Sequence, residues 1–178
     1  VVTALLGLVA FPPAVAAFAL LLSDRRLGGF ALNPLGGGDP VIYQHLFWFL
    51  AHPEVYVLIL PALGIVAEVI ANNTRKPLWG YKAMVGATLF LGFMSFIVWA
   101  HHMFMTGMGT AISAFFQTTT MIISVPSVVI LSALLLSLWG GSIRFTTPML
   151  FALGFLPMFG IGGLIGLPLG LAPTDIHL

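Results

Sequence analysis

The residues that could carry chemistry in this chain are a few ionisable side chains set in long apolar stretches. His52 and Glu54 share one such stretch, and His101 and His102 are adjacent in another. Ionisable groups in apolar spans normally face a protein interior and mark ion, proton or cofactor sites. A lone histidine there is more often a hydrogen-bonded core residue, but two adjacent imidazoles suit a metal ion approached by both rings. Because the chain has no cysteine, thiolate ligands are excluded.

Two further residues lie close to His52 in the sequence. Tyr56 is four residues on, so the two side chains share one face of a helix. A phenol beside a redox metal can donate an electron and a proton. Glu54 lies about 200° round the helix from His52 and therefore points away from the proposed metal. A carboxylate so placed is a candidate proton carrier, and the alternative is a glutamate that hydrogen-bonds a neighbouring helix.

The elements that must position these side chains are membrane-spanning helices. The 178 residues are 60% hydrophobic and 6% charged, whereas a soluble domain carries roughly 25% charged residues. Helices satisfy their backbone groups internally, and the apolar runs do not alternate as in a barrel. We therefore predict an all-α integral membrane protein, and the net charge of +1 argues against nucleic acid as a partner. Five stretches reach the length that spans a bilayer: about 3–22, 41–72, 83–105, 115–138 and 147–172.

The distribution of Lys and Arg predicts how these spans are oriented. Loops 73–82 and 139–146 hold most of the basic residues, so we expect them on the cytoplasmic side, or in the matrix of an organelle. The second span then begins on the outer side at Asp39, whose carboxylate can cap a helix that starts with proline. His52 lies about 20 Å along this helix, and the histidine pair lies near the outer end of the third span. The three imidazoles are predicted to meet there and to suit Cu, Zn or Fe.

Two motifs resemble a known family. The run from Gly36 to Tyr56 reads GGGDPVIYQHLFWFLAHPEVY, and the run from Trp99 to Met103 reads WAHHM. Both are similar, in order and spacing, to subunit I of the haem–copper terminal oxidases. The likeness covers essentially the whole chain and implies a fragment with five of the twelve helices of that bundle. We expect the chain to be an internal segment of a larger protein.

The resemblance implies roles for individual side chains. His52, His101 and His102 match three ligands of the copper that faces the oxygen-binding haem. Tyr56 matches a tyrosine covalently bonded to the first of those ligands. Glu54 matches a branch-point carboxylate at the end of one proton pathway.

The resemblance also implies cofactor contacts, partners and a location. Trp48 and Trp99 match aromatics at the binuclear centre, and Asp175 matches a carboxylate near the haem propionates and a magnesium site. The haem ligands lie outside this segment. The implied protein reduces O2 to water with electrons from cytochrome c or quinol, takes up and pumps protons, and works with other oxidase subunits. It is expected in the lipid bilayer of the bacterial cytoplasmic membrane, with the mitochondrial inner membrane as the alternative.

Three positions depart from the family pattern. Ala51 replaces a glycine, Ile130 replaces the lysine of a second proton pathway, and Ala67 replaces a serine at the mouth of that pathway. An isoleucine cannot carry a proton, so a non-pumping or nitric oxide reductase-like member is the nearest alternative. Tyr56 argues against the reductase, because its electron and proton are needed to cleave an O–O bond. A non-redox transporter and an inactive paralogue are further alternatives.

Overall fold

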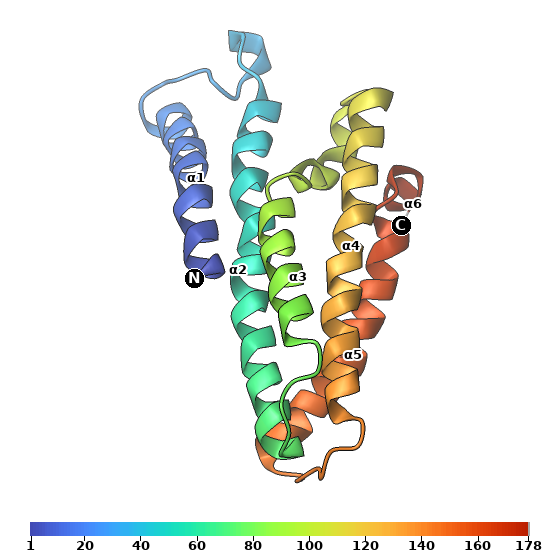
Figure 1. Ribbon diagram of the computed structural model, residues 1–178. Coiled ribbons are helices and arrows are strands. Elements are labelled where there is room, and N and C mark those ends of the chain that lie inside the picture. Colours follow the sequence, from blue (N-terminus) through green and yellow to red (C-terminus); the bar gives the residue numbers. More distant parts are fainter. Residues whose placement is uncertain (178) are drawn as a thin grey trace.

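Five long apolar helices lie side by side in the computed structural model, which describes residues 1–177 and the side chains of residues 1–175 (Figure 1). Each of the five is long and apolar enough to cross a membrane when the third is taken as Tyr81–Thr106. Within the described residues there are no β-strands, so the predicted all-α membrane fold is confirmed. The elements in chain order are α1 (Val2–Arg26), η1 (Pro34–Gly36), α2 (Pro40–Thr74), α3 (Tyr81–Met94), η2 (Trp99–Thr106), α4 (Thr110–Leu138), α5 (Thr147–Leu169) and α6 (Ala172–His177).

The third span consists of two segments and not of one uninterrupted α-helix over residues 83–105. α3 ends at Met94, and the adjacent histidines lie in the 3₁₀ segment η2, which begins at Trp99. At the break, the Ser95 hydroxyl donates a hydrogen bond of 2.7 Å to the Gly92 carbonyl, a back-bond that bends helices. Successive side chains of a 3₁₀ helix point about 120° apart, compared with about 100° on an α-helix. The two adjacent histidines therefore leave the backbone at a wider angle than they would on an α-helix.

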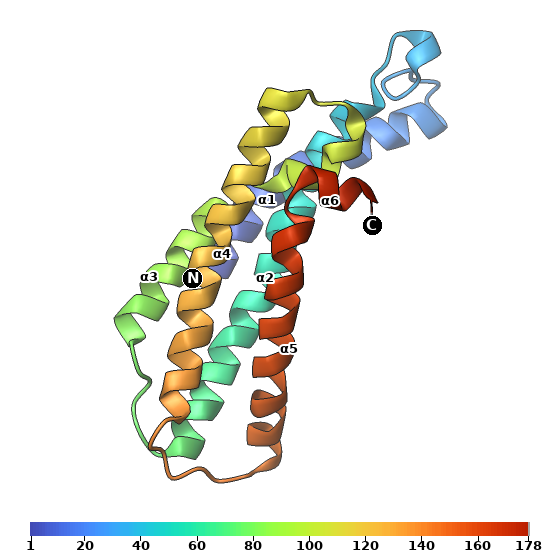
Figure 2. The same ribbon diagram turned by 90° about the vertical axis from the view of Figure 1, so that its right-hand side faces the viewer.

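The apolar core lies where α2, α3, α4 and α5 pack together. α2 runs through the middle of the bundle and contacts the other four long helices (Figure 2). Most of the buried apolar side chains of these helices form one cluster, which Leu6 of α1 joins. Ile130 of α4 and Ala67 of α2 both belong to it and are 0% and 4% exposed. The two positions at which the family pattern has a lysine and a serine are therefore packed within an apolar core.

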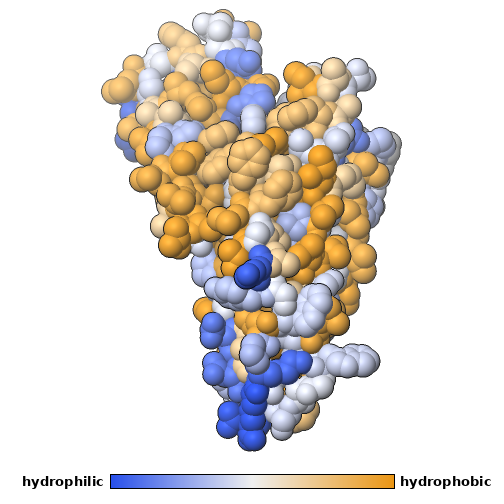
Figure 3. All heavy atoms as spheres, viewed as in Figure 1, coloured by the Kyte–Doolittle hydropathy of each residue, from blue (hydrophilic) through white to orange (hydrophobic). Residues whose placement is uncertain are grey.

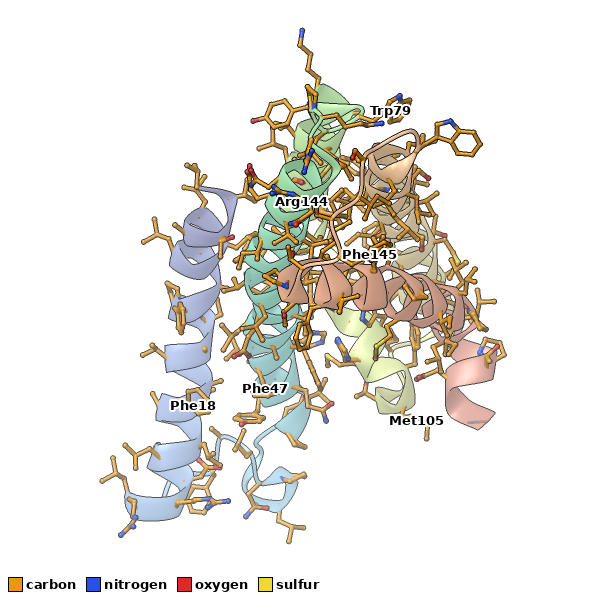
Figure 4. The ribbon with its side chains drawn as sticks, turned by 90° about the horizontal axis from the view of Figure 1, so that it is seen from below. Phe18, Phe47, Trp79, Met105, Arg144 and Phe145 are labelled. Atoms are coloured by element: carbon orange, nitrogen blue, oxygen red, sulfur yellow. The ribbon has the colours of Figure 1, made fainter. Side chains whose placement is uncertain are left out.

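Loops 75–80 and 139–146 lie at the same end of the bundle, here called the basic end (Figure 1). The Arg144 N–H donates to the Asn73 carbonyl at 2.9 Å, and the Thr146 hydroxyl donates to Asn73 Oδ1 at 2.8 Å. Figure 4 shows Arg144 over this end of α2, and Figure 3 shows hydrophilic side chains gathered below the apolar surface. These hydrogen bonds join the last turn of α2 to the loop that leads into α5.

The opposite end of the bundle carries the connection from α1 to α2. As predicted, Asp39 caps α2, because its Oδ1 accepts a hydrogen bond from the Val41 N–H at 2.8 Å and a proline occupies the first turn. The Asp24 carboxylate accepts from the N–H groups of Ala31 at 3.0 Å and Leu32 at 2.7 Å. Two carboxylates therefore fix the path by which the chain enters α2.

Candidate metal centre

Three histidines from two distant segments converge in the half of the bundle opposite the basic end. His52 comes from α2, and His101 and His102 come from η2. His52 Nδ1 and His102 Nε2 are 3.2 Å apart, as are His101 Nε2 and His102 Nε2. One nitrogen of each ring lies within 4.8 Å of the other two. The predicted meeting of the three imidazoles is confirmed.

The spacing of these nitrogens fits a single bound metal ion. Nitrogen ligands that lie about 2.0–2.1 Å from a tetrahedral metal are about 3.3 Å from one another. Two nitrogen pairs in the cluster are 3.2 Å apart and so come close to that value. A donor set of three imidazoles suits copper, zinc or iron. Two of the three nitrogen pairs therefore have the spacing that one such ion requires, and the third pair lies within 4.8 Å.

Two of the rings are held by side chains from outside the cluster. Trp48 stacks on His102, with ring centroids 4.0 Å apart and planes 8° apart. The Thr120 hydroxyl of α4 lies 3.0 Å from His101 Nδ1. Stacking fixes the plane of one ring, and a polar partner fixes the rotation of the other. Both contacts leave the Nε2 atoms directed at the common centre.

The ring of His52 has different surroundings from the rings of His101 and His102. His52 is 5% exposed, and its Nε2 is a buried atom with no hydrogen-bond partner within the described part of the chain. Tyr56 lies one turn further along α2, with its ring centroid 5.0 Å from that of His52. Buried polar atoms are normally paired, so an unpaired ring nitrogen beside a phenol needs a chemical explanation.

A cavity of about 690 Å³ opens beside the histidines. The tyrosine and the histidine pair line one side of it, and α4 and α5 line the others. α5 contributes Gly160, Gly163 and Gly166, which are spaced three residues apart and so lie along one side of the helix, and Gly170 directly after α5 also lines the cavity. At Gly163 and Gly166 no atom of a neighbouring element lies close to the backbone, so a ligand can approach α5 there between the apolar side chains that also line the cavity.

The remaining predicted site residues lie at different places around the cluster. Asp175 lines the cavity. The Trp99 Nε1–H donates to His45 Nδ1 at 3.2 Å, and the indole packs on Phe116. Glu54 is exposed and belongs to neither the cluster nor the cavity, in agreement with its predicted direction away from His52. The structure therefore brings Asp175 to the cavity but not Glu54.

Sequence reasoning missed a row of hydroxyl groups on α4. Thr120, Ser124 and Ser127 all line the cavity. Their spacing of four and three residues places them on one helical face. Three hydroxyls at helical spacing within an apolar span are a signal that could have identified this face.

Known proteins resemble the chain over its whole length. The family model described as "Cytochrome C and Quinol oxidase polypeptide I" matches residues 1–178. "Cytochrome c oxidase subunit 1" of Bacillus sp. (strain PS3) is 48% identical over 98% of this chain and 28% of its own length. Proteins of the same name from Cereibacter sphaeroides and Synechocystis sp. are each 47% identical, over 98% and 99% of this chain. The chain spans only 31% and 32% of those two relatives.

Proposed function

Because this chain belongs to the cytochrome c and quinol oxidase polypeptide I family, we propose that it forms the copper-binding part of the catalytic subunit of a respiratory terminal oxidase. The proposed reaction is the reduction of O2 to water with electrons from cytochrome c or quinol. The observation that carries the proposal is the convergence of one nitrogen each from His52, His101 and His102 within 4.8 Å. The bacterial relatives support a location in the bacterial cytoplasmic membrane, with the basic end on the cytoplasmic side.

The histidine cluster fits copper, and the adjacent cavity fits a haem. Support for copper comes from the all-imidazole donor set and its nitrogen spacing. Support for haem comes from a largely apolar cavity of about 690 Å³ whose wall on α5 includes three glycines, where a large flat ring can approach the helix backbone. When bound, the copper and the haem iron supply electrons and open coordination positions to dioxygen. This chain holds the copper and forms walls of the haem cavity, while the haem ligands lie on other helices of the subunit.

Tyr56 is proposed to give an electron and a proton when the O–O bond breaks. It lines the cavity, and its ring lies 5.0 Å from that of His52. The unpaired His52 Nε2 supports a covalent bond from this nitrogen to the Tyr56 ring. Forming that bond removes one hydrogen from the nitrogen and one from a ring carbon, which is a two-electron oxidation for which O2 is the oxidant.

Proton supply and the surroundings of the haem are proposed to involve two carboxylates. Glu54 is assigned the delivery of protons, and its position on the far side of α2 from His52 supports a route along that side of the helix. Asp175 lines the cavity and is assigned to the haem propionates and an adjacent magnesium ion. Two tryptophans are assigned to the packing of the binuclear centre. Trp48 stacks on His102, and Trp99 donates a hydrogen bond to His45.

A second candidate is a member of the same superfamily with altered proton pumping or a nitric oxide reductase-like activity. Ile130 favours it, because a fully buried isoleucine within an apolar cluster closes the route on which the family pattern has a lysine. Tyr56 favours the oxidase, because it lines the cavity beside the copper site where an O–O bond would be split.

The proposal is tested in the intact, full-length complex with His102→Ala and the matched control His45→Ala. His102 Nε2 lies 3.2 Å from a nitrogen of each of the other two rings, so its removal should lower copper content below about a tenth of wild type and abolish O2 consumption. His45 is exposed and outside the cluster, so its variant should retain copper. Metal analysis and an oxygen electrode give both readouts.

Two results would contradict the proposal. A fully active His102→Ala complex that retains copper would remove the histidine cluster from the mechanism. A wild-type complex without copper would instead favour the non-redox transporter.

A further inference from the structure

A chain of two hydrogen bonds leads from His101 into the backbone of α4. Thr120 Oγ1 lies 2.6 Å from the Phe116 carbonyl oxygen and 3.0 Å from His101 Nδ1. Phe116 and Thr120 are four residues apart on α4, so the first bond is local to that helix. The second bond crosses from α4 to η2, and it reaches the ring nitrogen that faces away from the cluster.

The direction of these two bonds follows from counting hydrogens. A hydroxyl has one hydrogen to donate, and a carbonyl oxygen can only accept. The short contact to Phe116 therefore takes the Thr120 hydrogen, and the hydroxyl oxygen is left to accept from His101. A neutral imidazole carries its hydrogen on one nitrogen only, so Nδ1 of His101 is the protonated one. Its Nε2 is then an unprotonated lone pair, 3.2 Å from His102 Nε2.

We propose that Thr120 is a positioning residue that sets the tautomer and the rotation of His101, so that Nε2 faces the cluster as a ready metal ligand. This inference rests on the proposed copper site, and it adds a residue of α4 to a site that otherwise comes from α2 and η2. Hydrogen-bond partners of this kind orient a ligating histidine and raise its basicity. Without the hydroxyl, His101 is free to carry its hydrogen on Nε2 or to rotate away.

The same helix offers a matched control for the loss of a hydroxyl. Thr118 also donates to a carbonyl of its own helix, that of Ala114, at 2.8 Å. It is exposed and does not line the cavity. Thr118→Val and Thr120→Val therefore make the same chemical change on one helix, and only the second removes a partner of a histidine.

The experiment measures copper retention in the full-length complex against increasing concentrations of a copper chelator. Thr120→Val should lose copper at a chelator concentration about 10–100-fold lower than wild type, the usual effect of removing such a partner. Thr120→Ser keeps the hydroxyl and should restore retention, and Thr118→Val should match wild type. If Thr120→Val does not assemble, Thr120→Ala makes the same test with a residue that favours helix.

The outcomes separate this inference from the proposed function. Wild-type retention in Thr120→Val or Thr120→Ala would overturn the role of Thr120 while leaving the copper site in place. Equal copper loss in Thr120→Ser and Thr120→Val would also overturn it, because the hydroxyl would then not be the group that matters. Failure of the wild-type complex to bind copper would instead contradict the proposed function itself.

Discussion

Ile130→Lys should destabilise the complex and should not create a working proton route. The isoleucine side chain is fully buried in the cluster shared by α2, α3, α4 and α5. Ala67, which lies in the same cluster, offers no hydroxyl to an incoming ammonium group. The lysine would therefore place a charge among apolar neighbours.

The expected loss of stability is roughly 3.5–6.5 kcal/mol. A lysine within a membrane helix costs about 2.5–3.5 kcal/mol, and a longer side chain in a well-packed site adds about 1–3 kcal/mol. Ile130→Met is the matched control, because it keeps the volume without the charge and should cost less than about 1.5 kcal/mol. The difference is large for a protein whose total stability is about 5–15 kcal/mol.

The assay compares the yield and the thermal inactivation of the purified full-length complex for the two variants, together with O2 consumption. We expect Ile130→Lys to assemble poorly and to inactivate at a lower temperature than Ile130→Met, with no gain in turnover. If the lysine variant were as stable as the methionine variant, water or polar groups would have to reach residue 130. The interpretation of this region as a closed apolar core would then be refuted.

Two other substitutions test separate parts of the molecule. Glu54→Gln should lower O2 consumption at least about tenfold if the carboxylate delivers protons, yet leave copper content unchanged because Glu54 lies outside the histidine cluster; normal turnover in this variant would remove Glu54 from the proton route. Asp24→Ala removes the acceptor of two backbone N–H groups and should cost about 1–2 kcal/mol locally, so hydrogen exchange at Ala31 and Leu32 should accelerate about 5–30-fold. Unchanged exchange there would mean that other contacts hold this connection.

The spans and the meeting of the histidines could be predicted from sequence because both depend on length and direction along a helix. A run of about 20 apolar residues defines a span, and the basic loops define which ends lie together. Counting residues from Asp39 to His52, and from the third span's far end to His101, then places all three rings in the outer halves of their spans. The cap at Asp39 was predictable for a similar reason, since it depends on two neighbouring residues.

The features that could not be predicted depend on contacts between helices or on local competition for hydrogen bonds. The end of α3 at Met94 involves one back-bond from Ser95, whereas apolar residues continue on both sides of the break. The contact between Thr120 and His101 joins two segments whose rotation about their axes no single-helix pattern determines. The cavity requires the side of α5 that carries these glycines to be turned toward α4, which depends on packing across the bundle.

The histidine cluster and the cavity are formed by different parts of the chain, and this determines the order in which their residues are synthesised. All three rings, and the threonine that holds one of them, have been synthesised by residue 120. The glycine wall of the cavity ends at Gly170, about 50 residues later, which is about 2.5–10 s at about 5–20 residues per second. The nascent chain therefore possesses all three histidines of the proposed copper site before it possesses the last residues that line the cavity proposed for the haem. If the proposed function holds, delivery of the metal and delivery of the haem can be separate events in its biogenesis.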